Sequence, residues 1–357
     1  MIRNKSMPSL KAKLAKKLKV AIVGLGNAGK MHAQAFGRNE HCELKYFCDI
    51  DHPTALTAAR EFYGVKVVTD YEKIVNDKSV DIISIATYDS DHFAQVIPAL
   101  ERGKHLFVEK PLCRSIKEAK AIRNAWEKGG RPVLESNPMS RGSKLYNWLS
   151  TLIERGGLGT IYAIDAEYWY GRLHKITDGW RKDVENYSVL QGGAIHLLDV
   201  AFMLTQERPN QVMAMGNRIV TAESDFRYDD FTTAMFRFPS SMILRLTANF
   251  GCVHKHQHIL RVFGTQATFL LDDTGARLHA TRDSITSGLK EGASPALPID
   301  LPYKPPHKGE LIKPFVELIV SGADPSALLQ RNLDVVTVLA SADKASHEQK
   351  EGKIIYV

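Results

Sequence analysis

Three glycines near the start of the chain constrain its fold more than any other feature of the sequence. Gly24, Gly26 and Gly29 follow a short apolar run and precede an amphipathic stretch that begins at Lys30. This order predicts a strand, a tight turn and a helix, because a side chain at these positions would obstruct the turn, the approach of a pyrophosphate or the helix packing. The N-terminus of such a helix attracts phosphate groups. We therefore predict a dinucleotide-binding turn, with contacts from Gly24, Gly26, Asn27, Ala28 and Gly29.

Asp49 strengthens this interpretation, because it ends the next apolar stretch about twenty residues after the last of these glycines. A carboxylate at this place accepts hydrogen bonds from the adenosine ribose hydroxyls and repels a 2′-phosphate. The sequence therefore predicts NAD rather than NADP as the cofactor. A plain structural turn is the alternative, but the strand, the helix and the acid together favour a dinucleotide.

Length and charge limit the class of protein. A chain of 357 residues suggests two domains at roughly 100–200 residues each. Residues 1–19 hold seven basic and no acidic residues, so the rest of the chain carries 40 of each. A nucleic-acid-binding protein would be expected to carry a basic face in its folded part, so the balanced body argues against that class.

We predict a solvated basic extension over residues 1–18 and a soluble, cytoplasmic protein. No stretch reaches the roughly 18 apolar residues that span a bilayer, so no membrane partner is expected. The four cysteines show no C-x-x-C spacing, which argues against a zinc site or a disulfide framework. A reducing compartment fits this usage best.

Two patterns of secondary structure divide the chain. Short apolar runs alternate with helical patterns over residues 19–137, which predicts a doubly wound parallel sheet of the Rossmann type. From residue 138 to residue 357, longer strand patterns follow one another with few helices between them, which predicts an α+β domain with a large, mostly antiparallel open-faced sheet. The first domain would bind NAD, and the second would supply the substrate wall and the contacts between subunits.

Lys110 is the first candidate catalytic residue. It lies in the sequence Glu109-Lys110-Pro111, directly after a short apolar strand, and the proline restricts its backbone to an extended conformation. Ligands of open parallel sheets bind beside such strand ends. An ammonium there can hydrogen-bond a substrate hydroxyl or the carbonyl that it becomes. The alternative is a surface lysine at a turn.

His196 is the second candidate, because an alcohol that loses hydride from carbon must also lose its oxygen proton, and imidazole titrates near neutral pH. The glycines at 192 and 193 suggest that backbone and ligand approach each other closely here. Without them, a histidine at the start of an apolar helix would be read as a packed structural residue.

Three ordered motifs resemble those of the Gfo/Idh/MocA oxidoreductases. Residues 24–32 are similar to the phosphate loop of that family, residues 103–112 to its lysine-containing segment, and residues 193–199 to its histidine-containing helix. The resemblance implies a Rossmann domain joined to an open-faced α/β domain, and oxidation or reduction of a sugar or cyclitol hydroxyl. It also implies an acid/base role for His196 and a homodimer or homotetramer formed through the open sheet.

The sequence departs from the family pattern where an aspartate usually stands four residues before the histidine, because position 192 is glycine. Three neighbours are candidates for a supporting role. Gln191 could orient a hydroxyl, Tyr187 could supply a phenol, and Asp199 lies on about the same helix face as His196 and could fix its orientation.

Further candidates follow from matching positions in the family. We predict cofactor contacts from Thr87, His92, Glu109 and Lys110. Tyr88 and Asp89 depart from the usual pattern of this loop and could alter how the nicotinamide ribose is held. We predict substrate contacts from Arg141, Arg172, Trp180 and Arg181, since guanidinium groups suit carboxylates and phosphates.

His254, His256 and His258 alternate along a predicted strand and would share one face. No acidic partner accompanies them, so we expect no metal site. The sequence thus predicts an NAD-dependent oxidoreductase that acts on a secondary alcohol or ketone of a sugar, nucleotide-sugar or cyclitol. The alternative is a non-catalytic NAD-binding sensor of the same fold.

Overall fold

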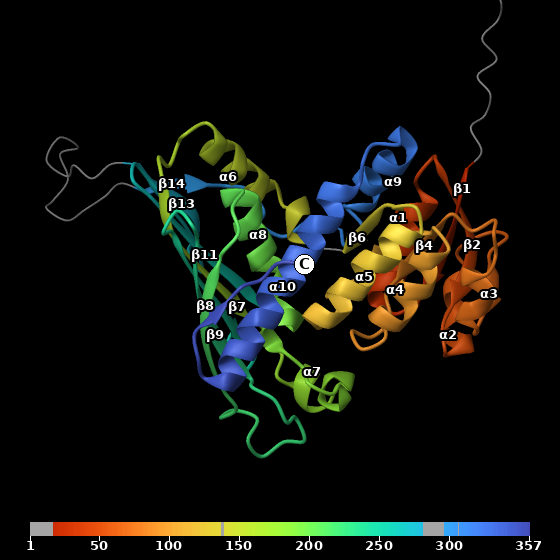
Figure 1. Ribbon diagram of the computed structural model, residues 1–357, viewed down its shortest axis with the longest axis horizontal. Helices are drawn as coiled ribbons and strands as arrows, with labels where there is room; N and C mark the ends of the chain where they lie inside the picture. The colour runs from red at the N-terminus through yellow and green to blue at the C-terminus, as the bar shows by residue number, and fades with distance from the viewer. Residues whose placement is uncertain (1–16, 137–138, 281–295, 306) are drawn as a thin grey trace, which may run out of the picture.

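The computed structural model describes residues 17–136, 139–280, 296–305 and 307–357. The domain boundary predicted at residues 137–138 and most of the basic extension predicted at residues 1–18 lie outside this part. The chain forms two sheets with helices between and around them, as Figure 1 shows.

The first sheet is parallel throughout and has the strand order β3-β2-β1-β4-β5-β6. Its strands β1 and β4 have fully buried segments, as expected for a sheet that is covered on both faces. This arrangement confirms the predicted Rossmann domain. The strands are β1 (Leu18–Val23), β2 (Cys42–Cys48), β3 (Lys66–Val68), β4 (Ile82–Ile85), β5 (His105–Val108) and β6 (Leu134–Ser136).

Five helices connect these strands. The longest of them starts with a capping box, in which the side chain of Ser115 accepts a hydrogen bond from the backbone of Glu118 and the Glu118 carboxylate accepts one in return. The helices are α1 (Asn27–Gly37), α2 (His52–Ala59), α3 (Tyr71–Val75), α4 (His92–Glu101) and α5 (Ile116–Lys128).

The second sheet has nine strands in the order β14-β13-β12-β11-β7-β10-β9-β8-β15. Only β7 and β10 are parallel neighbours, and the other pairs are antiparallel, which confirms the mostly antiparallel sheet that was predicted. The strands are β7 (Ile161–Trp169), β8 (Gln211–Asn217), β9 (Phe231–Arg237), β10 (Ile243–Asn249), β11 (Gln257–Gly264), β12 (Thr268–Asp272), β13 (Gly275–His279), β14 (Ala296–Ile299) and β15 (Gly352–Lys353).

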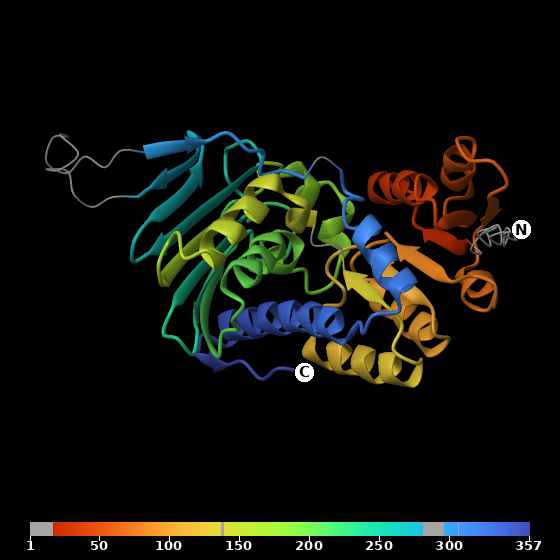
Figure 2. The same cartoon turned by 90° about the horizontal axis from the view of Figure 1, so that it is seen from above.

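Helices cover only one face of this sheet (Figure 2). Alternate residues of β7, β10 and β11 are buried beneath these helices, which gives the sheet an apolar inner face. The helical segments after residue 138 are η1 (Met139–Gly142), α6 (Lys144–Glu154), α7 (His174–Thr177), η2 (Trp180–Asp183), the π-helix η3 (Leu190–Ala194), α8 (Ile195–Thr205), α9 (Ile312–Ser321) and α10 (Ser326–Glu348).

The outer face of the nine-stranded sheet carries no helix among the described residues (Figure 2). Met213, Met235, Arg245 and Asp165 stand opposite one another across β8, β9, β10 and β7. Met213 and Met235 are 58% and 53% exposed, and Arg245 forms an ion pair with Asp165 at 3.1 Å. The outer face therefore combines exposed apolar side chains with charges of both signs.

The chain returns to the Rossmann domain near its C-terminus. Ile312, Phe315 and Val316 of α9 are buried in one core with residues of β1 and α1, and the ring of Phe315 lies 5.4 Å from that of Phe107 in β5. Helix α9 belongs to the range 138–357 that was predicted as the second domain, yet its apolar face completes the first. Within the described chain, every helix is too short or too polar to pass through a lipid bilayer.

Candidate active site

The turn after β1 has the geometry that a bound pyrophosphate requires. Gly24 has φ +84°, and a Cβ added there would lie 2.5 Å from the carbonyl oxygen of Ala86. A Cβ on Gly29 would overlap the Gly24 carbonyl, whereas one on Gly26 would meet nothing within 4 Å. Asn27, Ala28 and Gly29 form the first turn of α1, whose backbone N–H groups have no partner within the helix. The open space therefore lies in front of a helix N-terminus.

Asp49 lies at the wall of a pocket of about 360 Å³ that starts at this turn and is also lined by Gly24, Gly26, Asp51 and Thr87. Its carboxylate accepts hydrogen bonds from the backbone N–H groups of Leu25, at 2.7 Å, and Asp51, at 2.9 Å. The carboxylate is thus fixed beside the pocket. The donors of the turn and the acid at the far end fit the phosphates and the ribose of NAD.

The remaining cofactor candidates occupy different positions relative to this pocket. Thr87 lines it and donates its hydroxyl proton to the Gln95 side chain at 2.8 Å. His92 is fully buried, with Nδ1 2.7 Å from the Pro111 carbonyl oxygen and Nε2 3.3 Å from that of Thr87. His92 therefore connects the Thr87 loop to the Pro111 loop, and its predicted contact with the cofactor stays a prediction. Glu109 lies 3.2 Å from Nε2 of the buried His32.

Lys110 stands at the C-terminal end of β5 and precedes a cis peptide bond to Pro111. Its Nζ donates a hydrogen bond of 2.9 Å to the carbonyl oxygen of Gly192. This contact joins residues 82 positions apart and brings the lysine to the π-helical turn that leads into His196. Single π-helical turns occur frequently at functional sites.

A buried carboxylate holds this turn from behind. Asp343 of α10 accepts hydrogen bonds of 2.7 Å from the Ser188 hydroxyl and from Nε2 of Gln191, and Gln191 also donates to the Arg114 carbonyl at 3.1 Å. Burial raises the pKa of Asp343. The amide nitrogen of Gln191 is thus directed toward α10, whereas its Oε1 is buried without a hydrogen-bond partner among the described atoms. Its predicted role in orienting a substrate hydroxyl stays a prediction.

Tyr187 occupies the space beside Gly192. A Cβ on Gly192 would overlap the Tyr187 hydroxyl and would lie 2.9 Å from Cζ of the ring. The hydroxyl accepts a hydrogen bond from Nε of Arg181 at 3.1 Å, so its own proton remains available for another acceptor. Burial raises the pKa of Tyr187 well above the ordinary phenol value. The tyrosine is therefore a neutral hydrogen-bond donor in the place of the absent side chain.

His196 starts α8, and 7% of it is exposed. Burial, followed by the charge of Lys110, lowers its pKa to about 3. Its Nδ1 is buried without a hydrogen-bond partner among the described atoms. The ring is therefore neutral, and one of its nitrogens is not engaged by the protein.

Two predicted site residues pair with each other. Nε of Arg141 lies 2.6 Å from Oδ2 of Asp199, and its second nitrogen lies 2.8 Å from Oδ1. Arg331 lies 3.9 Å from the same carboxylate and forms an ion pair with the buried Glu135. The Asp199 carboxylate therefore pairs with arginines that the sequence pattern could not place beside it, and its predicted support of His196 stays a prediction.

The three clustered histidines lie at different depths. The ring centroid of His258 is 6.4 Å from that of His196 and 5.4 Å from that of His256, and Tyr168 lies 4.9 Å from His256. His254 instead lies 3.1 Å from Asp273. No group of histidine, cysteine and acidic side chains in the described ranges could hold a metal ion. His256 and His258 form an aromatic wall behind His196.

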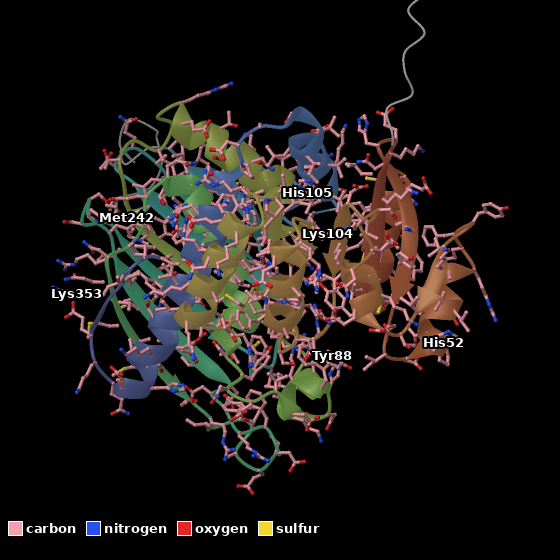
Figure 3. All side chains as sticks on the ribbon, turned by 45° about the vertical axis from the view of Figure 1, so that its right-hand side comes forward. His52, Tyr88, Lys104, His105, Met242 and Lys353 are labelled. Carbon is pink, nitrogen blue, oxygen red and sulfur yellow. The ribbon has the colours of Figure 1, made fainter. Side chains whose placement is uncertain are left out.

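The rim loop over residues 171–187 reaches across to the Rossmann domain. The ring of Trp180 stacks on that of Tyr88 at 4.7 Å, and Figure 3 shows Tyr88 next to the segment that carries α7. The guanidinium of Arg181 lies 4.4 Å from the centre of the Trp180 ring, and that of Arg172 lies 5.3 Å from the centre of Tyr170. The predicted substrate residues Trp180 and Arg181 thus lie at the junction of the two domains.

Comparison with known proteins identifies both domains. Residues 18–136 match the profile of an oxidoreductase family with an NAD-binding Rossmann fold, and residues 146–270 match a GFO/IDH/MocA C-terminal domain. Together these ranges cover more than half of the chain. They confirm the resemblance found in the sequence and NAD as the cofactor.

Relatives with these domains are distant. An uncharacterized oxidoreductase of Bacillus subtilis, YrbE, is 25% identical over 272 residues, which cover 73% of this chain and 75% of that protein. A myo-inositol 2-dehydrogenase of Thermotoga maritima is 23% identical over 345 residues, 93% of this chain and 97% of that protein.

Among solved structures, a levoglucosan dehydrogenase in complex with NADH and L-sorbose superimposes with a TM-score of 0.81. It is 19% identical, and the match covers 95% of this chain and 99% of that one. At this level of identity the likeness shows the fold alone. The two matched domains assign this chain to the Gfo/Idh/MocA family of NAD-binding oxidoreductases.

Proposed function

We propose that this chain transfers a hydride between NAD and a secondary alcohol or ketone of a sugar, nucleotide-sugar or cyclitol. One observation supports it above the others: Lys110 Nζ bonds to the turn that leads into His196. Lys110 follows β5, and Thr87, which follows the neighbouring parallel strand β4, lines the cofactor pocket. The names of the relatives agree with the substrate class, since they include inositol dehydrogenases and a levoglucosan dehydrogenase.

Each protein group has a distinct part in the proposed reaction. When bound, NAD accepts or donates the hydride at its nicotinamide ring. Lys110 holds the substrate oxygen and stabilises the charge that develops on it. In the oxidation direction, His196 accepts the hydroxyl proton, and its Nδ1, which is buried without a hydrogen-bond partner among the described atoms, supports this role.

Replacing Lys110 tests the proposal. In Lys110→Met, we expect kcat to fall by about a hundredfold or more, because a positioned proton-handling group contributes this much. The assay follows NADH absorbance during oxidation of a panel of sugars and inositols, and NADH binding is measured separately by fluorescence titration. NADH affinity should stay close to that of the unaltered protein, since the pyrophosphate turn is untouched.

Lys117→Met is the matched control, because Lys117 is exposed on α5 in the same connection. It should leave both kcat and NADH affinity unchanged. Full turnover in Lys110→Met would refute the role of the lysine. A protein that binds NADH but oxidises or reduces no member of the panel would instead support the sensor alternative.

The cell compartment and the assembly are also part of the proposal. We place the protein in the cytoplasm, in keeping with four cysteines that are all free. We also propose a homodimer or homotetramer formed through the outer face of the nine-stranded sheet. Its exposed methionines, at 53–75% exposure, would be covered in such an assembly.

A further inference from the structure

Positive charges without close carboxylate partners lie around His256 and His258. Elsewhere in the second domain, arginines form close ion pairs, as between Arg208 and Asp334, Arg245 and Asp165, and Arg277 and Asp272. Within the described chain, Arg172, Arg181 and Lys304 form no such pair, and each lies instead over an aromatic ring. We name these three residues the cationic wall.

Ring contacts connect each member of the cationic wall to the reacting centre. Lys304 lies 5.4 Å from the ring centre of Tyr303, whose ring is 5.5 Å from that of His258. His258 in turn lies 6.4 Å from His196. On this side, two rings separate a cation from the proposed base.

Arg172 and Arg181 reach the site through other aromatic groups. Arg172 lies over Tyr170, whose ring is 6.1 Å from that of His256. Arg181 donates to the Tyr187 hydroxyl, which lies against Gly192 beside Lys110. The cations thus come from two segments that are far apart in sequence, the rim loop with Arg172 and Arg181 and the segment with Lys304.

Carboxylates also act on this site. Glu109, which is 3.2 Å from His32, acts on His196, and Asp89 acts on Arg181 and Tyr187. His196, His256 and His258 carry no negative charge. Burial lowers the pKa values of these histidines, and the positive charges of Lys110, Arg172 and Lys304 lower them further. The site therefore presents an excess of hydrogen-bond donors and positive charge.

We propose that the substrate carries an anionic group, a carboxylate or a phosphate ester on a sugar or cyclitol, and that the cationic wall binds it. The proposal rests on the hydride-transfer function proposed above and specifies its substrate class. Arginine forks match planar carboxylates and phosphates, and Tyr187 offers an additional proton to such an oxygen. A neutral polyol would leave these donors to water.

Pairs of substrates that differ by one charged group test this inference. The pairs are a hexose and its uronate, the same hexose and its 6-phosphate, and an inositol and its monophosphate. Carboxylates and phosphate esters are thus tested separately. Binding to the protein–NADH complex is measured by titration calorimetry, and kcat/KM with NAD by NADH absorbance. We expect the anionic member of at least one pair to bind about tenfold or more tightly than its neutral partner, as charge-assisted hydrogen bonds allow.

Arg172→Gln and Arg181→Gln should each weaken binding of the anionic partner more than binding of the neutral partner, so that most of the preference is lost. Arg172 is exposed, so its replacement carries little risk of unfolding. Arg155→Gln is the control, because it removes an equal charge from the exposed end of α6, and it should preserve the preference.

The two readouts separate the two proposals. Three results would overturn the proposed role of the cationic wall. Neutral sugars could bind and react as well as the anionic ones, the arginine variants could weaken binding of both partners equally, or no anionic member of the panel could bind. Tight binding of an anionic member without turnover of any member would support the wall and count against hydride transfer.

Discussion

At the scale of single residues, glycine at position 192 and tyrosine at position 187 depend on each other. The Tyr187 hydroxyl fills the space that a side chain at 192 would need, and it is held there by Arg181. The sequence shows that the usual aspartate is missing, but not what replaces it, because the approach of a ring five positions earlier depends on the fold of the rim loop. The motifs alone identified Lys110 and His196 as candidates, and the structure connects Lys110 to the turn that leads into His196.

We expect Gly192→Ala to lower the free energy of unfolding by about 1–3 kcal/mol, as overpacking does in well-packed sites. Tyr187→Phe in the same chain should recover part of this loss, because the hydroxyl is the atom that the new Cβ overlaps. Urea unfolding of both single variants and the double variant measures the coupling. Gly352→Ala, whose Cβ would meet its nearest neighbour at 3.5 Å, serves as control, and additive effects would contradict the contact.

Neutral histidines make stability depend on pH. The pKa values of His196 and His256 are lowered to about 3 and about 4, chiefly by burial, and that of His258 is lowered well below 6.5. Below pH 6.5 the unfolded chain therefore binds protons that the folded chain does not. We expect the free energy of unfolding to be highest above pH 6.5 and to fall from there toward about pH 4.

Urea unfolding over this pH range measures the slope. His258→Asn should reduce the slope by up to about 1.4 kcal/mol per pH unit, the value for one proton. His52→Asn, at an exposed position on α2 that is labelled in Figure 3, should leave the slope unchanged. An unaltered slope in His258→Asn would mean that this ring is charged or accessible in the folded protein.

At the scale of elements, the sequence predicted the order of strands and helices well, because periodicities of two and of three to four residues are local properties. It did not predict the π-helical turn η3, whose backbone depends on distant contacts. Gln191 and Asp343 are 152 positions apart, and no periodicity links them. The sequence also did not predict the ion pair between Arg141 and Asp199.

Asp343 accepts hydrogen bonds from Ser188 and Gln191, so its removal should destabilise the turn η3. In Asp343→Ala, the Ser188 hydroxyl and the Gln191 amide each lose a buried acceptor, which costs about 1–3 kcal/mol per group. We expect a corresponding loss in the free energy of unfolding and a lower kcat with unchanged NADH affinity. Asp343→Asn keeps an acceptor oxygen and should recover much of both properties.

Glu348→Ala on the same helix is the matched control for Asp343→Ala, since Glu348 is an exposed acid whose ion pair with Lys344 is 3.8 Å long. Surface pairs of this kind contribute little. Equal losses of stability in Asp343→Ala and Glu348→Ala would show that the turn does not rely on the buried carboxylate.

At the scale of the whole molecule, the outer face of the nine-stranded sheet is left uncovered by helices among the described residues. Alternating burial along its strands was predictable, whereas the assembly that would cover the outer face was expected only from the family resemblance. Met213 and Met235 stand opposite each other on this face. Contiguous exposed apolar side chains of this kind mark surfaces of association.

We expect sedimentation velocity to show a dimer or tetramer, and Met235→Glu to shift it toward monomer, because the new charge would be buried in the interface. Val320→Glu, at a similarly exposed position (54%) on α9, should leave the assembly intact. A protein that is monomeric at all accessible concentrations would show that this face does not mediate self-association.

The return of α9 to the first core limits how this chain can be divided or recombined. The first 136 residues lack the apolar layer that Ile312, Phe315 and Val316 provide, so a truncation after β6 would leave that surface open to water. An exchange of cofactor domains between relatives would have to transfer two separate stretches of the gene. One encodes the first 136 residues, and the other encodes α9 and the start of α10, whose Leu329, Leu333 and Val336 are buried with residues of the first sheet. The cofactor module is thus discontinuous, and chimeras designed with a single crossover should aggregate.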